Sequence, residues 1–226
     1  MTNVVCLKWG TKYSSDYVNR LHSMVKRNLT IKHRFICLTD DPTGINPDIE
    51  CLPIPDEDGL TGWWFKLMLF KKRLHNIGGP TLFLDLDVVI TGNIDGLFTH
   101  RPGEFAIIRD WSYAHRVWNS SVFRLDIGSH PDIWNDFQTD KKAIMKRLHG
   151  DQDWITERIP ECTTWPTDWV ISYKVSCNAK GSLDQPAILP EGAKIVVFHG
   201  LPNPGDVMNA PSGRWRHAPW IKDHWR

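Results

Sequence analysis

Apolar runs and amphipathic stretches alternate through the first part of the chain. Residues 3–9 and 33–39 are apolar runs that predict buried strands, and residues 49–54 predict a third. Between the first two, residues 14–28 bring Tyr17, Leu21, Met24 and Val25 onto one helical face, after a Ser14 or Ser15 cap. This alternation predicts a parallel sheet with helices on its faces.

The pattern continues to a strand that carries two acids. A helix over about residues 63–75 is expected to end before Gly78, Gly79 and Pro80, and a strand over 82–90 follows. Along a strand, positions two apart share a face, so Asp85 and Asp87 should project together. Two neighbouring carboxylates repel each other, so a cation is expected between them.

In the second half of the chain, strands and helices no longer alternate regularly. Strands are expected within 104–110 and 119–126, and a helix over 129–150, with Ser129 as its cap, Pro131 in its first turn and Gly150 beyond its end. Residues 160–192 are rich in Pro, Gly and polar residues and predict loops. A last buried strand is expected over 193–200.

Composition narrows the classes of protein. With 226 residues, 41% of them hydrophobic, the chain suits one large globular domain. A net charge of +1 gives no overall attraction to nucleic acid or anionic membrane. No apolar stretch is long enough to span a bilayer, and we expect no signal peptide. Five cysteines, an odd number without C-x-x-C spacing, favour a reducing cytoplasm over a disulfide framework or a zinc site.

Three interpretations of the two aspartates remain open from the strand alone. They can be structural, with Asp87 capping a turn and Asp85 pairing with a lysine. D-x-D-x-[TV] after an apolar strand is also typical of haloacid dehalogenase-type phosphohydrolases, in which the first Asp is a nucleophile. That motif normally ends the first strand of its fold, whereas here other strands precede it. The third interpretation is a divalent metal that carries a diphosphate.

Further motifs support the third interpretation. After D-x-D come "NSSVF" (119–123), "GDQDWI" (150–155) and "VVFHGLPNP" (196–204). In this order they resemble the retaining glycosyltransferases related to family eight, the glycogenin-like and bacterial galactosyltransferase group. The chain also resembles small bacterial and phage glycosyltransferases with "VVCLKWGTKY" and "GWWFKL" segments. The resemblance covers residues 3 to about 205.

The resemblance implies a fold and an activity. The fold is GT-A, a Rossmann-like α/β/α sandwich with a mainly parallel sheet, in one domain over residues 1–226. Residues 1–91 would form the nucleotide-binding half, 92–205 the acceptor and catalytic half, and 206–226 a basic, Trp-rich tail. The activity is metal-dependent transfer of a sugar from a nucleotide sugar, expected to be a UDP-sugar, to an acceptor hydroxyl, with retention of configuration.

The resemblance also implies the metal ligands. Asp85 and Asp87 would hold Mn²⁺ or Mg²⁺, and His199 would be the third protein ligand. An imidazole beside carboxylates tilts the preference toward Mn²⁺. Lys66 would pair with the first aspartate or contact phosphate.

Donor contacts are expected at the ends of the first two strands and near the last one. Open parallel sheets bind ligands at the carboxyl ends of their strands. The positions that would contact base, ribose, phosphate or donor sugar are Trp9, Gly10, Tyr13, Thr39, Asp40, Asn119 and Gly200.

The reacting centre is expected in the D-Q-D segment. Asp151, Gln152 and Asp153 would orient sugar hydroxyls and stabilise an oxocarbenium-like transition state. The same segment also predicts a helix start, because acids favour the N-terminal dipole.

Two positions depart from the family pattern. Ser121 stands where the family commonly has glycine, and "HGLPNP" lacks the lysine that usually contacts the diphosphate. Asn203 lies near that place in the sequence, and Arg214 would be a candidate substitute.

The acceptor is left open by the sequence. Residues 214–226 contain four Lys or Arg and three Trp. Such mixtures bind membranes or nucleic acids. The alternatives are a lipid-linked or surface glycan, a hydroxymethylated DNA base flipped out of the duplex, or a tail that simply packs on the domain. A nucleotide-sugar binder without turnover is a further alternative, although it would have no need of three metal ligands.

Overall fold

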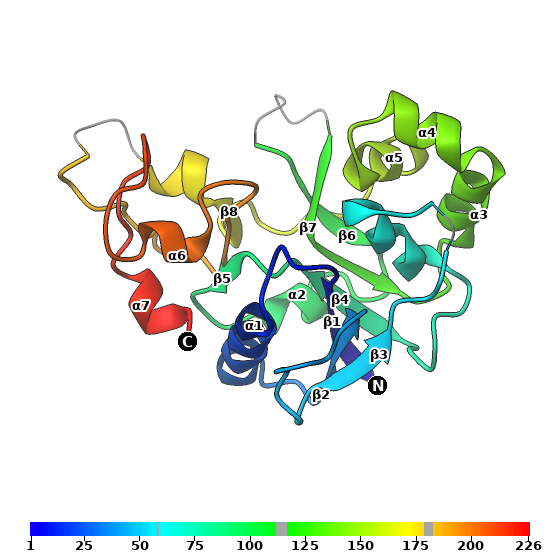
Figure 1. Ribbon diagram of the computed structural model, residues 1–226, viewed down its shortest axis with the longest axis horizontal. Helices are drawn as coiled ribbons and strands as arrows, with labels where there is room; N and C mark the ends of the chain where they lie inside the picture. Colours follow the sequence, from blue (N-terminus) through cyan, green and yellow to red (C-terminus); the bar gives the residue numbers. More distant parts are fainter. Residues whose placement is uncertain (58, 112–116, 179–182) are drawn as a thin grey trace.

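The computed structural model describes residues 1–57, 59–111, 117–178 and 183–226, arranged around two sheets (Figure 1). The strands of the larger sheet are β1 (Thr2–Lys8), β2 (His33–Thr39), β3 (Glu50–Pro53), β4 (Pro80–Leu84), β6 (Ala106–Arg109) and β7 (Trp118–Asp126). The strands of the smaller sheet are β5 (Val88–Ile90), β8 (Val170–Ser172) and β9 (Ile195–Val197). The helices are α1 (Ser15–Asn28), α2 (Gly96–Thr99), α3 (Pro131–Thr139), α4 (Lys141–Arg147), α5 (Asp151–Arg158), α6 (Pro204–Val207) and α7 (Ile221–His224), with a 3₁₀ helix η1 (Gly62–Phe70) and a π-helix η2 (Tyr173–Cys177).

The larger sheet has the strand order β3-β2-β1-β4-β7-β6. Its first four strands are parallel, whereas β7 is antiparallel to both β4 and β6. The predicted mainly parallel sheet is therefore confirmed. Because the order reverses direction on either side of β1, the carboxyl ends of β1 and β4 open a crevice of the kind in which such sheets bind ligands.

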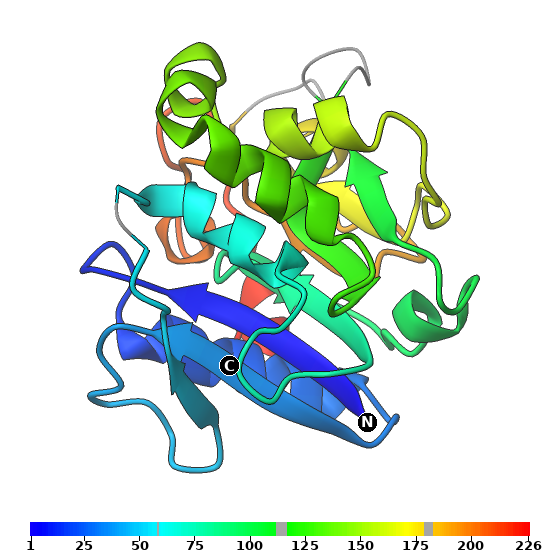
Figure 2. The ribbon, with the colours of Figure 1, turned by 90° about the vertical axis from the view of Figure 1, so that its right-hand side faces the viewer.

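Helices cover both faces of this sheet, as Figure 2 shows from the side. Alternate strand residues separate into two cores: Val4 and Cys6 pack with the α1 side, whereas Val5 packs with η1, α3 and α5 on the other side. The face of α1 that points to the sheet carries Leu21 and Met24, as its spacing predicts. The α/β/α sandwich expected from the resemblance is confirmed.

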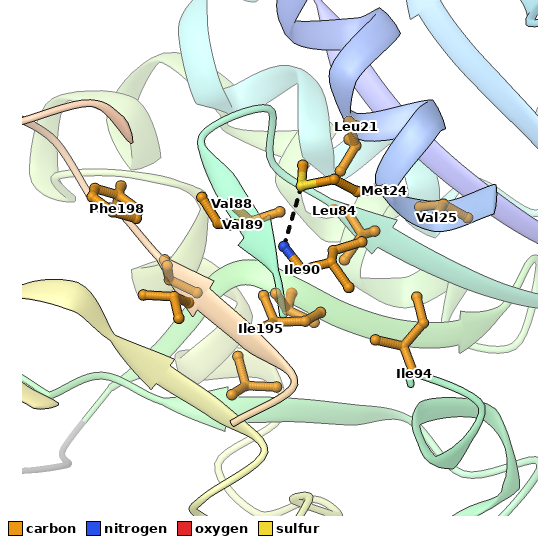
Figure 3. Close-up of a cluster of buried hydrophobic side chains, with 14 of the residues drawn as sticks. Leu21, Met24, Val25, Leu84, Val88, Val89, Ile90, Ile94, Ile195 and Phe198 are labelled. Carbon is orange, nitrogen blue, oxygen red and sulfur yellow. Dashed lines mark hydrogen bonds between the residues drawn. The ribbon is translucent and has the colours of Figure 1, made fainter. Parts of the chain in front are cut away.

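The smaller sheet continues the α1-side core. In Figure 3, Leu21 and Met24 of α1 lie against β5, and the backbone N–H of Ile90 donates to the sulfur of Met24 at 3.3 Å. β9 lies between β5 and β8, antiparallel to the first and parallel to the second. β5 thus ties the two sheets together.

The expected single strand over residues 82–90 is wrong. β4 ends at Leu84 in the larger sheet, and β5 begins at Val88 in the smaller one. Between them the Asp85 N–H donates to Ser121 O (2.9 Å) of β7, and Asp87 O accepts from Phe198 N (3.2 Å). An apolar run can supply two strands, and hydrophobicity alone does not say which sheet each strand joins.

Three other expected elements differ. The helix expected over 63–75 is the shorter 3₁₀ helix η1. The one expected over 129–150 divides into α3 and α4 at Asp140, whose backbone is not helical, and His130 rather than Ser129 precedes α3. The segment 160–192, expected to be loops, also contains β8 and η2. The break between α3 and α4 at Asp140 is explained by the preference of aspartate for helix ends.

The basic tail packs on the domain through its aromatic side chains. Trp225 is buried against α1, where the Arg20 guanidinium lies 4.4 Å from its ring centroid and donates to its carbonyl. Trp215 and Trp220 are half-buried. The packing alternative for the tail is therefore the one observed.

Within the described ranges of the chain, no helix has the length and apolar character needed to cross a membrane.

Candidate active site

A cavity of about 750 Å³ opens at the carboxyl ends of β1 and β4, between the two sheets and η1. Its described lining includes most of the residues singled out from the sequence. These are Trp9, Tyr13, Lys66, Asp85, Asp87, Asn119, Asp151, Gln152, His199 and Gly200. Segments far apart in the chain therefore converge on one place.

Lys66 is an internal counter-ion of the aspartate pair. Its Nζ lies 2.8 Å and 2.9 Å from the two carboxylate oxygens of Asp85, and 3.3 Å from the hydroxyl of Ser120. Burial alone would lower the pKa of Lys66, but the nearby carboxylates of Asp85 and Asp151 outweigh it and raise that pKa. The predicted pairing of Lys66 with the first aspartate is present in the structure.

Asp87 is the more deeply buried aspartate. Its carboxylate accepts a hydrogen bond from the Tyr13 hydroxyl at 3.0 Å. Burial, and then the charge of Asp85, raises the pKa of Asp87 to about 7. The two acids thus face one cavity with an incompletely compensated negative charge, although they lie in a turn and not in a strand.

His199 lies directly after β9 and reaches the same cavity. Its Nε2 is 2.7 Å from the hydroxyl of Ser172, and its ring stacks on Trp111 at 5.5 Å between centroids and 15° between planes. Burial, and then the Lys174 charge, lowers the pKa of His199. A neutral imidazole is the form that binds metals.

These residues fit a divalent cation chemically but do not form a closed metal site. Over the described part of the chain, no three His, Cys, Asp or Glu side chains are already grouped so that they could hold a metal ion. The donor types of Asp85, Asp87 and His199 nevertheless suit Mn²⁺ or Mg²⁺. The excess negative charge in a buried setting would be relieved by such an ion.

The D-Q-D segment begins helix α5, as its acids predicted, and its three members lie differently. Asp151 is 3% exposed, burial raises its pKa, and its Oδ2 has no hydrogen-bond partner among the described residues. Gln152 also lines the cavity. Asp153 is not among the described lining residues, and its carboxylate accepts from the His149 N–H at 2.9 Å. Asp151 and Gln152 therefore line the cavity, whereas Asp153 holds the turn that precedes α5.

Asn119 lines the cavity but is already held by the protein. Its Nδ2 donates to Asp110 at 3.1 Å, and its Oδ1 accepts from the Ser121 N–H at 3.1 Å. Ser121 is itself part of the lining. This arrangement fixes the start of β7 beside the aspartates, and contact of Asn119 with a donor stays a prediction.

A second cavity of about 460 Å³ adjoins the first and shares Trp9 with it. Gly10 lines it in a left-handed conformation (φ 57°) and donates its N–H to Asp40 at 2.8 Å. Thr39 is not among the described lining residues of either cavity, and its hydroxyl bonds the backbone of Asp41. Asp40 is therefore better placed than Thr39 to meet a ligand.

Near Gly200 the structure brings in a cation that sequence reasoning missed. Lys174 of η2 donates to the His199 carbonyl at 2.6 Å, and its Nζ would be 3.7 Å from a Cβ on Gly200. Both Lys174 and Arg214 lie over the ring of Trp215. Asn203 instead caps α6. No local signal marked Lys174, because its segment was predicted to be a loop.

Comparisons with solved structures identify the fold. The galactosyltransferase LgtC, solved with donor and acceptor sugar analogues, is 12% identical, with 89% of this chain and 88% of that chain covered and a TM-score of 0.61. GlyE, a glycosyltransferase of Streptococcus pneumoniae TIGR4, is 14% identical over 90% of this chain and 56% of that chain, with a TM-score of 0.65. For the bifunctional glycosyltransferase WbbM the identity is 10%, the coverage 91% and 47%, and the TM-score 0.61.

This chain spans about half the length of WbbM and GlyE but nearly all of LgtC. No protein-family model matches the sequence, and no curated protein matches it. At 10–14% identity the likeness is one of fold. The chain has the GT-A-like fold of these glycosyltransferases.

Proposed function

We propose that this protein is a metal-dependent glycosyltransferase that moves a sugar from a nucleotide sugar, most simply a UDP-sugar, to an acceptor hydroxyl. One observation carries the proposal: Asp85, Asp87 and His199 line a single cavity. They do so at the strand ends where open α/β sheets bind ligands, in a chain with a glycosyltransferase fold.

Asp85, Asp87 and His199 would hold the cation, Mn²⁺ or Mg²⁺. When bound, such an ion neutralises the diphosphate and the charge that develops on the leaving group. Lys66 keeps Asp85 oriented through two contacts, and Tyr13 does the same for Asp87 through its hydroxyl. Preorganised ligands of this kind lower the reorganisation needed when donor arrives.

Asp151 and Gln152 would meet the donor sugar. The buried Asp151 Oδ2 that lacks a partner among the described residues can accept a hydrogen bond from a sugar hydroxyl. An active-site variant of LgtC carries glutamate in place of a glutamine, and Gln152 is the glutamine in the described lining of this cavity. We assign both side chains as stabilisers of the transition state, and we propose retention of configuration on the basis of the family resemblance.

The nucleotide would lie along the β1 end of the cavity. Trp9 and Tyr13 line that end with aromatic side chains, and Gly10 and Asp40 lie in the adjoining cavity. At the other wall, Gly200 has φ 71° and no side chain, which lets a phosphate approach its backbone.

The phosphohydrolase alternative has less support. In that class the first aspartate follows the first strand of the fold, whereas Asp85 follows β4. The remaining proposals are a cytoplasmic location in a bacterial or phage setting and an acceptor that is a glycan, a lipid-linked glycan or a modified DNA base.

The decisive experiment measures thermal stability against nucleoside diphosphates and nucleotide sugars, each with and without Mn²⁺. A ligand that binds only the native state raises its stability by about 2.7 kcal/mol at a hundredfold excess over Kd. We expect stabilisation that needs both the metal and one nucleotide. Asp87→Ala should abolish it, whereas Asp132→Ala, at an exposed position on α3, should not.

Stabilisation that persists unchanged in Asp87→Ala would remove the metal-site argument. No response to any nucleotide, together with metal-dependent cleavage of a phosphate monoester, would favour the phosphohydrolase. Metal-dependent nucleotide binding without transfer or hydrolysis of any donor would identify a binder.

A further inference from the structure

Two adjacent tryptophans at the start of η1 have opposite environments. Trp64 is 6% exposed and stacks on Phe137, with 5.5 Å between ring centroids and 12° between planes. Trp63 is 53% exposed and lines the cavity. An indole left half in water forgoes about half of the free energy that full burial would give. The core therefore accounts for Trp64 but gives no reason for Trp63.

Trp63 is nevertheless held in a defined orientation. Its Nε1 donates to the His149 carbonyl at 3.2 Å. Its ring edge lies against Gly150, where a Cβ would stand 2.8 Å from Nε1 and 3.0 Å from Cδ1. Gly150 has an extended backbone (φ −172°), a conformation open to any residue, so the close approach of the indole is what restricts this position to glycine.

The indole stands next to the proposed reacting groups. In a 3₁₀ helix, residues three apart lie on one face and are separated by about 6 Å along the axis. Trp63 is therefore one turn from Lys66, whose Nζ contacts Asp85. On the other side of the indole, Gly150 precedes Asp151 and Gln152 directly. An exposed aromatic face thus borders the place where donor sugar and acceptor have to meet.

The polar groups near this face are a hydroxyl, an imidazole and an amide. Thr61, His149 and Gln152 line the cavity near Trp63. The cations in the described lining are Lys12, which lies over Tyr13, and Lys66, which is committed to Asp85. Nucleic-acid binding draws most of its affinity from Lys and Arg contacts to phosphates, and this edge offers none among its described residues. An aromatic face with hydroxyl, imidazole and amide groups beside it suits the C–H face and hydroxyls of a sugar ring.

We propose that Trp63, held by His149 and Gly150, is the stacking platform of an acceptor subsite for a neutral saccharide. This inference rests on the proposed glycosyltransferase function and narrows its acceptor from glycan or DNA to a glycan. Trp63 binds and positions the acceptor ring, while Asp151 and Gln152 act on the donor.

The test uses the full chain labelled with 5-fluorotryptophan and saturated with UDP and Mg²⁺. The ¹⁹F resonance of Trp63 is identified by its absence in Trp63→Phe. Lactose, maltose and a duplex oligonucleotide containing hydroxymethylcytosine are then titrated separately. We expect a disaccharide to shift the Trp63 resonance with saturation, and the oligonucleotide to leave it unchanged.

Two variants report on the mechanism. Trp63→Ala should weaken disaccharide binding at least tenfold, because the ring face is gone. Gly150→Ala keeps every indole but drives Trp63 from its position, so it should weaken binding similarly. An affinity that is unchanged in both variants would overturn the proposal.

Failure of this inference differs visibly from failure of the proposed function. If metal-dependent UDP binding holds in the same samples but Trp63 responds only to UDP, only to the oligonucleotide, or to nothing, the acceptor platform is wrong and the transferase stands. If UDP does not bind while a disaccharide still shifts Trp63, the saccharide subsite stands and the transferase does not.

Discussion

Replacing Lys66 with methionine removes the cation that compensates Asp85 inside the cavity. Methionine keeps the length of the side chain, so the change is mainly one of charge. The Lys66 and Asp85 side chains are 9% and 23% exposed, and Nζ contacts both carboxylate oxygens at 2.8–2.9 Å. Removing one partner of a fully buried ion pair costs about 3–5 kcal/mol. Because Asp85 keeps some contact with solvent, we expect a loss of about 2–3 kcal/mol.

Urea unfolding measures this loss directly. With a slope of about 2.5 kcal/mol/M, the midpoint should fall by about 1 M. Arg147→Met is a matched control, since it also removes one cation from an ion pair. The side chains of Arg147 and Glu157 are 54% and 40% exposed, and such surface pairs contribute about 0–1 kcal/mol.

The same variant separates a structural ion pair from a metal site. If Asp85 and Asp87 bind a cation, Mn²⁺ should stabilise Lys66→Met more than it stabilises the unmodified protein, because the ion then supplies the missing positive charge. A loss below about 1 kcal/mol in the absence of metal would refute the view that Lys66 is a buried counter-ion. An equal response of both proteins to Mn²⁺ would refute the compensation argument.

Three further substitutions test how the scaffold is held, each by urea unfolding. Arg124 is 2% exposed and donates to five backbone carbonyls between residues 97 and 104. Each buried acceptor left without a partner costs about 1–3 kcal/mol, so Arg124→Met should destabilise by at least about 3 kcal/mol. A loss below about 1 kcal/mol would contradict that role. In Gly96→Ala the new Cβ would lie 2.6 Å from the Trp169 ring. We expect overpacking to lower the free energy of unfolding by about 1–3 kcal/mol. The double variant with Trp169→Leu should recover part of this loss, because the smaller side chain relieves the clash. Gly128→Ala combines φ 88° with a Cβ 2.8 Å from the Lys72 carbonyl, so it should destabilise by at least about 1–2 kcal/mol, whereas an unchanged midpoint would show that the turn rearranges.

Elements governed by local periodicity were predictable from the sequence. The apolar runs at residues 3–9 and 33–39 became β1 and β2, and the amphipathic spacing of residues 14–28 became α1 with Ser14 at its N-cap. These predictions held because strands and helices with one buried face must repeat apolar residues at fixed intervals. The acids of D-Q-D likewise marked the start of α5.

Predictions failed where packing overrides local preference. The run of residues 82–90 is apolar enough for one long strand, yet the chain turns at Asp85–Asp87 and divides its two ends between two sheets. The segment 160–192 contains β8, which forms only because β9 lies beside it. Neither choice is visible in a short window, since each depends on a partner far away in the sequence.

The candidate site divides in the same way. The apolar run pointed to Asp85 and Asp87, because charged residues within an apolar segment need partners. Lys66 and His199 were expected from the resemblance to the glycosyltransferase family. The sequence could not show that Tyr13 would hold Asp87, nor that Lys174 would reach Gly200. Nor could the sequence distinguish the adjacent Trp63 and Trp64, of which Trp64 is buried in the core and Trp63 faces the cavity. Residue chemistry is local and can be read along the chain, whereas burial and distance arise only when β4, β7, β9 and η1 meet, and those decided which groups act together.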